Sequence, residues 1–209
     1  YELPEASATA RGKSINQILT MSSNEQITAM LPVKEFVENQ HILMVTKQGT
    51  IKKTELSSFS NIRAGGLRAV TLEDGDTLVS VKITSGKNQI IIATANGQAV
   101  RFDEDDVRSM GRTAKGVKGI TLDEEEKDYV VAAEVVHPEE SLLVVTENGY
   151  GKRSKLEEYR KTSRGAKGVK TIKISERNGK VITMLSVAQD GDIMFTTNTG
   201  RVLRISVAS

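Results

Sequence analysis

The chain has 209 residues, of which 38% are hydrophobic and 27% charged, and its formal net charge is +2. These values are typical of a globular protein with one large or two small domains and a substantial core. No apolar run is long enough to cross a membrane and the first residues lack the pattern of a signal peptide, so we expect neither feature. The absence of cysteine excludes disulfides and thiolate chemistry and is consistent with a reducing compartment.

Along the chain, one set of four predicted strands recurs. The first strand follows a basic, glycine-containing segment, and we expect it at 67–72, 117–122 and 169–174. The second strand is expected at 77–83, 129–136 and 181–187. The third is a continuous apolar run typical of a strand buried on both faces, with the sequences HILMVT, QIIIAT, SLLVVT and DIMFTT. The fourth, such as AVRF or VLRI, is predicted to pair back onto the third through a tight turn.

Two landmarks share this period. The turn glycines Gly49, Gly97, Gly149 and Gly200 lie 48, 52 and 51 residues apart, and the basic segments recur in step at Gly12, Gly66, Gly116 and Gly168. The Asn-Gly pairs at 96–97 and 148–149 favour type I′ hairpins. We therefore predict an all-β protein in which each period forms one antiparallel four-stranded sheet and the sheets stack side by side like propeller blades. One repeat domain would span residues 1–209, with repeats at about 11–62, 63–111, 112–163 and 164–209.

Charge is segregated along the chain despite the small net value. Residues 160–170 carry five cations and no anion, whereas 123–128 carry five anions and 103–106 read DEDD. A single charged block is usually a solvated face, but recurrence of the cationic blocks at one interval favours a basic rim. We expect the acidic turns to lie away from this rim, since anions there would oppose binding of a polyanion. The missing Cβ of Gly116 and Gly168 is expected to let a ligand backbone approach.

Residues suited to catalysis or metal binding are largely absent. His41 and His137 are 96 residues apart and there is no cysteine, so a zinc site is not expected. Neither a phosphate-binding GxxxxGK[ST] motif nor a GxSxG nucleophile motif occurs, and the acidic DEEEKD lacks the ligand spacing of a calcium loop.

The basic segments are better suited to nucleic-acid phosphates. There is no tryptophan in the chain and no aromatic residue in these segments, which argues against stacking on single-stranded bases. Lysine, arginine, glycine and hydroxyl groups suit the phosphates of a duplex read without regard to sequence. Several patches would have to act together, because bending 20 to 30 base pairs by 40 to 90° costs roughly 1 to 6 kcal/mol. The predicted DNA-binding residues are Arg11, Lys13, Arg63, Arg68, Arg112, Lys115, Lys118, Arg164, Lys167 and Lys170.

The chain resembles the C-terminal domain of the DNA gyrase A subunit. The resemblance runs along essentially the whole chain and includes YELPEASATARGKSINQIL, GTIKKTELSSFSNIRAGGLRAVTLEDGD, GQAVRFDEDDVRSMGRTAKGVKGI and SRGAKGVKTIKI. It implies a β-pinwheel in which neighbouring blades exchange strands, and a role in wrapping duplex DNA so that negative supercoils are introduced. The parent would be an ATP-dependent type II topoisomerase, a bacterial cytoplasmic, nucleoid-associated heterotetramer of two A and two B subunits.

The same resemblance implies that this domain is non-catalytic and needs no cofactor, because ATP and Mg²⁺ are used elsewhere in the parent. A QRRGGKG box, normally in the first blade of the family, does not occur in this sequence and is expected upstream, and the ring is expected to be open or incomplete. Two alternatives remain. One is the equivalent domain of topoisomerase IV, and the other is a propeller-like protein-interaction module that binds its partner through the acidic faces.

Overall fold

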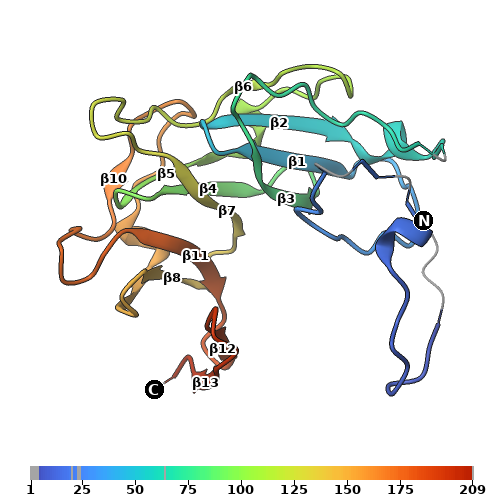
Figure 1. Ribbon diagram of the computed structural model, residues 1–209. Helices are drawn as coiled ribbons and strands as arrows, with labels where there is room; N and C mark the ends of the chain where they lie inside the picture. The colour runs from blue at the N-terminus through green and yellow to red at the C-terminus, as the bar shows by residue number, and fades with distance from the viewer. Residues whose placement is uncertain (1–4, 20, 23–24, 64, 209) are drawn as a thin grey trace.

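The computed structural model describes residues 5–19, 21–22, 25–63 and 65–208, and shows an all-β protein (Figure 1). The described residues form thirteen strands in four sheets. The other elements are short 3₁₀ turns, η1 (Ile15–Gln17), η2 (Leu56–Phe59), η3 (Glu104–Asp106) and η4 (Leu156–Glu158). No helix in this part of the chain is long and apolar enough to span a membrane. The predicted fold class is confirmed.

Four hairpins lie where the glycine turns predict them. Each turn glycine has a positive φ, from +79° to +86°, which glycine adopts without the steric cost that a Cβ brings. The hairpins are β1 (His41–Thr46) with β2 (Thr50–Glu55), β4 (Gln89–Thr94) with β5 (Gln98–Asp103), β8 (Ser141–Thr146) with β9 (Gly151–Lys155), and β12 (Asp192–Thr196) with β13 (Val202–Ser206).

The hairpins combine with strands from elsewhere in the chain. An inner strand that follows each of the first three hairpins returns to pair with that hairpin's first strand, and the first two sheets gain an outermost strand on the other side. The sheet orders are β3-β1-β2-β6, β10-β5-β4-β7, β11-β8-β9 and β12-β13, here called the first to fourth sheets. The remaining strands are β3 (Leu78–Thr84), β6 (Val117–Lys118), β7 (Val130–Val136), β10 (Val169–Lys170) and β11 (Val181–Val187).

The prediction that each period forms its own sheet is wrong. It places β7 in one sheet with β8, the next hairpin along the chain, but β7 pairs with β4 of the preceding hairpin. β6 is further from its partner along the chain, because it pairs with β2 and the strands β3, β4 and β5 all come between the two. The predicted first strands shrink to two residues at 117–118 and 169–170, and 67–72 is not a strand. The exchange of strands between sheets is what the pinwheel resemblance implies.

The core follows the third predicted strands, since β1, β4 and β8 are largely buried. One buried hydrophobic cluster joins the first and second sheets and contains Leu43, Ile51, Ile90 and Phe102. Another buried cluster joins the second sheet to the third sheet. The expectation fails for β12, whose residues are exposed or half-buried. In the described part of the chain its sheet consists only of β12 and β13, so β12 has a strand on one side only.

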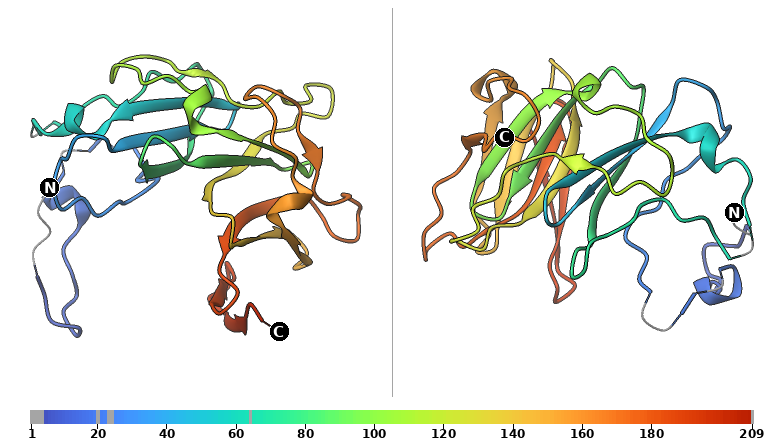
Figure 2. Two further views of the ribbon diagram at one scale, coloured as in Figure 1. Left: turned by 180° about the vertical axis from the view of Figure 1, so that it is seen from behind. Right: turned by 90° about the horizontal axis from the view of Figure 1, so that it is seen from above.

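The sheets follow one another along an open arc (Figures 1 and 2). The N-terminal segment lies outside the four sheets at one end of the arc, and the β12–β13 hairpin forms the other end. Inner strands β3, β7 and β11 contact one another in succession, which places them on the concave side and the outermost strands β6 and β10 on the outside. The predicted repeat boundaries are not tested by this arrangement and stay a prediction.

Candidate nucleic-acid interface

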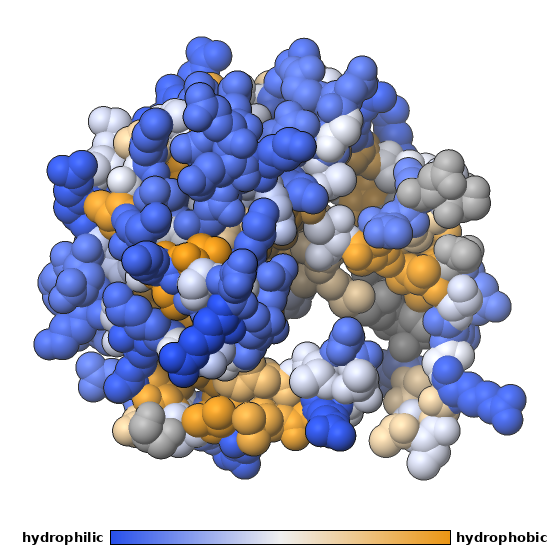
Figure 3. Space-filling model, turned by 60° about the vertical axis from the view of Figure 1, so that its left-hand side comes forward, coloured by the Kyte–Doolittle hydropathy of each residue, from blue (hydrophilic) through white to orange (hydrophobic). Residues whose placement is uncertain are grey.

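Two of the basic segments supply the outermost strands. Lys118 pairs with Thr50 of β2, and Lys170 pairs with Gln98 of β5. Each of these strands is only two residues long and lies at the outer edge of its sheet. The basic residues in and next to them therefore lie on the outer surface. The face that carries β10 is mainly hydrophilic, whereas an apolar patch lies at the lower edge of the molecule near β12–β13 (Figure 3). We call residues 63–72, 112–121 and 164–172 the basic belt.

Neighbouring parts of the belt are hydrogen-bonded directly to each other. Thr71 and Thr121 occupy equivalent places, five residues after Gly66 and Gly116. Each donates its backbone N–H and its hydroxyl to two carbonyl oxygens of the next segment. The N–H groups reach Ala114 (3.4 Å) and Ala166 (3.1 Å), and the hydroxyls reach Thr113 (2.8 Å) and Gly165 (2.6 Å). The belt is therefore continuous from one sheet to the next.

Most of the predicted DNA-binding residues are exposed, and not all lie on the belt. Arg11 and Lys13 are exposed but belong to the N-terminal segment outside the sheets. The exposed belt residues are Arg63, Arg68, Lys115, Lys118, Lys167 and Lys170. The remaining two, Arg112 and Arg164, are half-buried. Whether any of them binds DNA stays a prediction.

Arg164 is engaged within the protein. Its Nε donates to the carbonyl oxygen of Asp106 at 2.8 Å and its Nη1 to that of Lys118 at 3.1 Å. The guanidinium therefore joins the third belt segment to the second segment and to η3. The expectation that Arg164 is exposed is not met, and the geometry gives this residue a structural role in the belt.

The interpretation of Gly116 and Gly168 as places for a ligand backbone is corrected by the structure. A Cβ at Gly168 would lie 2.0 Å from the carbonyl oxygen of Ala99, and one at Gly116 would lie 2.7 Å from that of Ile51. The backbone that approaches these glycines is that of β5 and β2. Their missing Cβ lets the belt lie against the hairpins.

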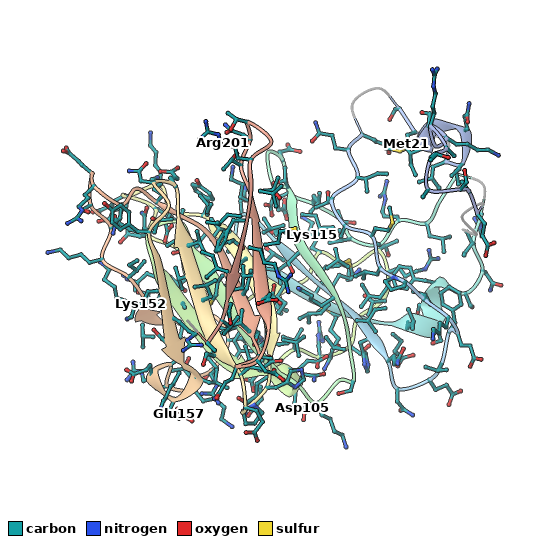
Figure 4. All side chains as sticks on the ribbon, turned by 90° about the horizontal axis from the view of Figure 1, so that it is seen from below. Met21, Asp105, Lys115, Lys152, Glu157 and Arg201 are labelled. Carbon is teal, nitrogen blue, oxygen red and sulfur yellow. The ribbon has the colours of Figure 1, made fainter. Side chains whose placement is uncertain are left out.

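The acidic turns are not all separate from the basic segments, contrary to expectation. Lys161 forms an ion pair with Asp103 of the acidic turn 103–106 (2.7 Å). Lys115 also pairs with an acidic residue, Glu73 (2.7 Å), which lies outside the two acidic turns. The hydrogen bond to Glu73 raises the pKa of Lys115. Separation holds for part of the surface, because Asp105 and Glu157 lie at one edge of the molecule and Lys115 lies well away from that edge (Figure 4). In the described part of the chain, no group of three or more histidine or acidic residues is placed to hold a metal ion.

Comparison with known proteins decides the family. The family described as the DNA gyrase C-terminal domain, a beta-propeller, matches residues 1–34, 40–85, 88–137, 140–188 and 191–209. The chain belongs to this family. From residue 40 onward, each matched segment begins at a hairpin, and the three complete ones end with its inner strand. The repeat unit of the family therefore corresponds to one hairpin with the inner strand that follows it.

Individual relatives agree with the family match. The DNA gyrase A subunit of Salmonella typhimurium is 46% identical over 208 residues, which cover 100% of this chain and 24% of that protein. The chain therefore spans about a quarter of the curated relative that it matches. Among solved structures, the C-terminal domain of a DNA topoisomerase IV has a TM-score of 0.87 at 31% identity, covering 94% of this chain and 61% of that one. A DNA gyrase A C-terminal domain has a TM-score of 0.84 at 28% identity, with coverages of 93% and 65%.

The chain also contains a buried lysine beneath the belt that sequence reasoning missed. Lys52 on β2 is 1% exposed, and its Nζ donates to the carbonyl oxygens of Ala69 and Arg112. Burial, followed by repulsion from Arg112, lowers the pKa of Lys52 to about 8. One signal in the sequence could have revealed it, because Lys52 and Lys53 are adjacent in a predicted strand, so that their side chains point to opposite faces and one of them must face inward.

We predict that Lys52 makes the folded state more stable at alkaline pH. Its folded pKa is depressed from 10.5, so between about pH 8 and 10.5 the unfolded chain binds more protons and the free energy of unfolding rises with pH. Lys52 should raise the free energy of unfolding by about 2 kcal/mol between pH 8 and pH 9.5. Urea unfolding of the wild type and of Lys52→Met, compared at the two pH values, measures it. An equal pH dependence in both proteins would contradict the assignment.

A second set of cations joins consecutive sheets. The fourth residue after each of the first three hairpin glycines is Lys53, Arg101 or Arg153, and it donates to the carbonyl oxygen of the seventh residue after the next hairpin glycine. Lys53 and Arg101 reach Glu104 (3.1 Å) and Leu156 (3.0 Å), and Arg153 reaches Val207. These clamp residues, as we call them, are occupied with packing one sheet on the next, which explains basic residues in β2, β5 and β9.

Proposed function

We propose that this domain binds duplex DNA along the basic belt and bends it around the outside of the arc. The observation that carries the proposal is the direct hydrogen bonding of successive belt segments through Thr71 and Thr121. Because the segments are joined, their exposed cations follow one path across neighbouring sheets. A duplex on a convex path must bend, and several contacts along that path are needed to offset the elastic cost.

The chemistry of the belt suits a phosphate backbone. Lys118, Lys167 and Lys170 are exposed ammonium groups at the outermost strands, where they can contact phosphates without reading bases. No aromatic side chain lies within the belt, so stacking on unpaired bases has no platform there. This proposal gives the domain no catalytic step and no cofactor of its own.

At the level of the parent protein, we propose a DNA gyrase A subunit. Wrapping by this domain would direct negative supercoiling by an ATP-dependent type II topoisomerase in the bacterial cytoplasm, with gyrase B and another copy of the gyrase A protein as partners. The 46% identity to the gyrase A protein of Salmonella typhimurium supports this proposal. The corresponding component of topoisomerase IV is the second candidate, favoured by the TM-score of 0.87 to the C-terminal domain of that enzyme.

Salt dependence tests the proposed function. For a 40-base-pair duplex, log K should fall linearly with log salt, with a slope of about −5 if the six exposed belt cations each neutralise one phosphate. Fluorescence anisotropy with several unrelated duplex sequences measures both the slope and the indifference to sequence. A domain that binds proteins through its acidic faces would show no such binding, and absence of binding at low salt would refute the proposal.

A further inference from the structure

Lys52 connects two segments of the basic belt from below. Its Nζ lies 2.5 Å from the carbonyl oxygen of Ala69 in the first segment and also donates to the carbonyl oxygen of Arg112 in the second. With 1% of its surface exposed, the side chain does not reach solvent. The two belt segments are therefore held at a fixed separation by one ammonium group.

The surroundings of Lys52 are unusual for a buried cation, because its acceptors are neutral carbonyl groups. Buried charges in proteins are normally paired with an opposite charge. Here the charged group that acts on Lys52 is Arg112, which carries the same sign. On the neighbouring strands, Met44 of β1 lies opposite Lys52, and β6 ends at Lys118, another cation.

The fold itself does not require a lysine at this position. The equivalent residue of β5, three places after its hairpin glycine, is Val100, which is 1% exposed in a sheet of the same strand order. In the third sheet the position is Lys152, whose Nζ donates to the carbonyl oxygen of Thr171 at 3.3 Å. Thr171 and Ala69 are equivalent, each three residues after a belt glycine. Lys152 is exposed, so it shares with Lys52 the hydrogen bond to a belt carbonyl but not the burial, and valine satisfies the packing in the sheet between them.

We infer that Lys52 is a positioning residue for DNA, which fixes the first two belt segments relative to each other and adds a positive charge beneath them. The inference rests on the proposed function. A buried charge is screened by salt less than an exposed one, so it can attract phosphates without touching them. It also acts from a fixed place, whereas an exposed lysine must lose side-chain entropy to hold its charge near a phosphate.

The test compares duplex binding by the wild type, Lys52→Met and Lys52→Arg. The matched control is Lys82→Met, which removes one cation from the inner strand β3, where Lys82 pairs with Glu134 at 2.8 Å. At pH 7 and low salt we expect Lys52→Met to weaken binding about 10-fold and Lys82→Met less than about 2-fold. Wild-type affinity should fall between pH 7 and 9.5 as Lys52 loses its proton, whereas Lys52→Arg should retain its affinity because its guanidinium stays charged.

The combination of pH effects separates positioning from a purely structural role. For the wild type, raising the pH should increase the stability of the fold and at the same time weaken DNA binding. If Lys52 only supported the fold, stability and DNA affinity would change in the same direction. A folded Lys52→Met that binds DNA with the affinity and pH profile of the wild type overturns the inference and leaves the proposed function standing. A wild type that binds no duplex DNA refutes both. If Lys52→Met does not fold, a wild-type affinity that is constant through pH 8 still overturns the inference.

Discussion

Replacing Lys118, Lys167 and Lys170 together by glutamate should weaken duplex DNA binding at low salt by at least about 100-fold. The three residues are exposed on the belt, and the change takes the formal net charge from +2 to −4, because each substitution subtracts two. The salt slope should become shallower by about 2.7, which is 0.9 for each of three phosphate contacts. Anisotropy titrations over a range of salt concentrations measure both quantities.

The choice of residues follows from the structure. Arg164 is left unchanged because its hydrogen bonds to Asp106 and Lys118 hold the belt together, so that its loss would confuse binding with folding. A control chain with Lys34, Lys87 and Lys155 changed to glutamate has the same net charge, and these exposed residues lie outside the belt. If both triple variants lose affinity equally, net charge and not the belt controls binding. On the proposal that the parent is a DNA gyrase A subunit, with DNA cleavage outside this domain, the belt variant should reduce negative supercoiling and leave cleavage intact.

Changing Gly168 to alanine should destabilise the protein by more than about 4 kcal/mol, the range reached by severe overpacking of a buried backbone. The new Cβ would lie 2.0 Å from the carbonyl oxygen of Ala99, and backbone atoms of β5 cannot move without breaking the pairing with β4. The φ of +80° adds strain for any residue with a Cβ. Urea unfolding followed by far-ultraviolet circular dichroism measures the loss.

Gly149→Ala is the matched control for this substitution. Gly149 has nearly the same φ, +79°, but a Cβ there would meet nothing within 4 Å. Its replacement should cost only about 1 to 2 kcal/mol from backbone strain. Equal losses at the two positions would mean that strain alone matters and that the close approach of belt and hairpin does not.

The repeat pattern is enough to predict the elements but not how they combine. Apolar runs and glycine turns correctly indicate the hairpins and the inner strands, because these depend on local geometry and on burial. Pairing between periods is not predictable in this way. β7 has the same length as its counterparts β3 and β11 and is rich in apolar residues as they are, so pairing with β4 or with β8 satisfies the pattern equally well. The choice depends on the crossover connection, which carries no periodic signal.

In the candidate site, too, some residues can be predicted from the sequence and others cannot. Exposed lysines such as Lys118 and Lys167 are found by charge and spacing, and the structure places them on the outer surface. Residues whose function depends on a distant carbonyl are misjudged or missed. Arg101 and Lys52 read as ordinary strand residues, yet their acceptors lie 55 residues on at Leu156 and 60 residues on at Arg112. The sequence can indicate that such a residue faces inward, but it does not indicate which distant carbonyl oxygen accepts the hydrogen bond.

The exchange of strands between sheets also has a consequence during synthesis of the chain. β2 ends at Glu55, but β6, which covers its edge, begins at Val117, 62 residues later. At a translation rate of about 5 to 20 residues per second, the edge of β2 would stay uncovered for roughly 3 to 12 s after it is made. The same delay applies to β5, which waits for β10. Each nascent sheet therefore exposes a strand edge to the crowded ribosome exit region until the next hairpin has been synthesised, and this interval is when the chain is most open to mispairing and most in need of a chaperone.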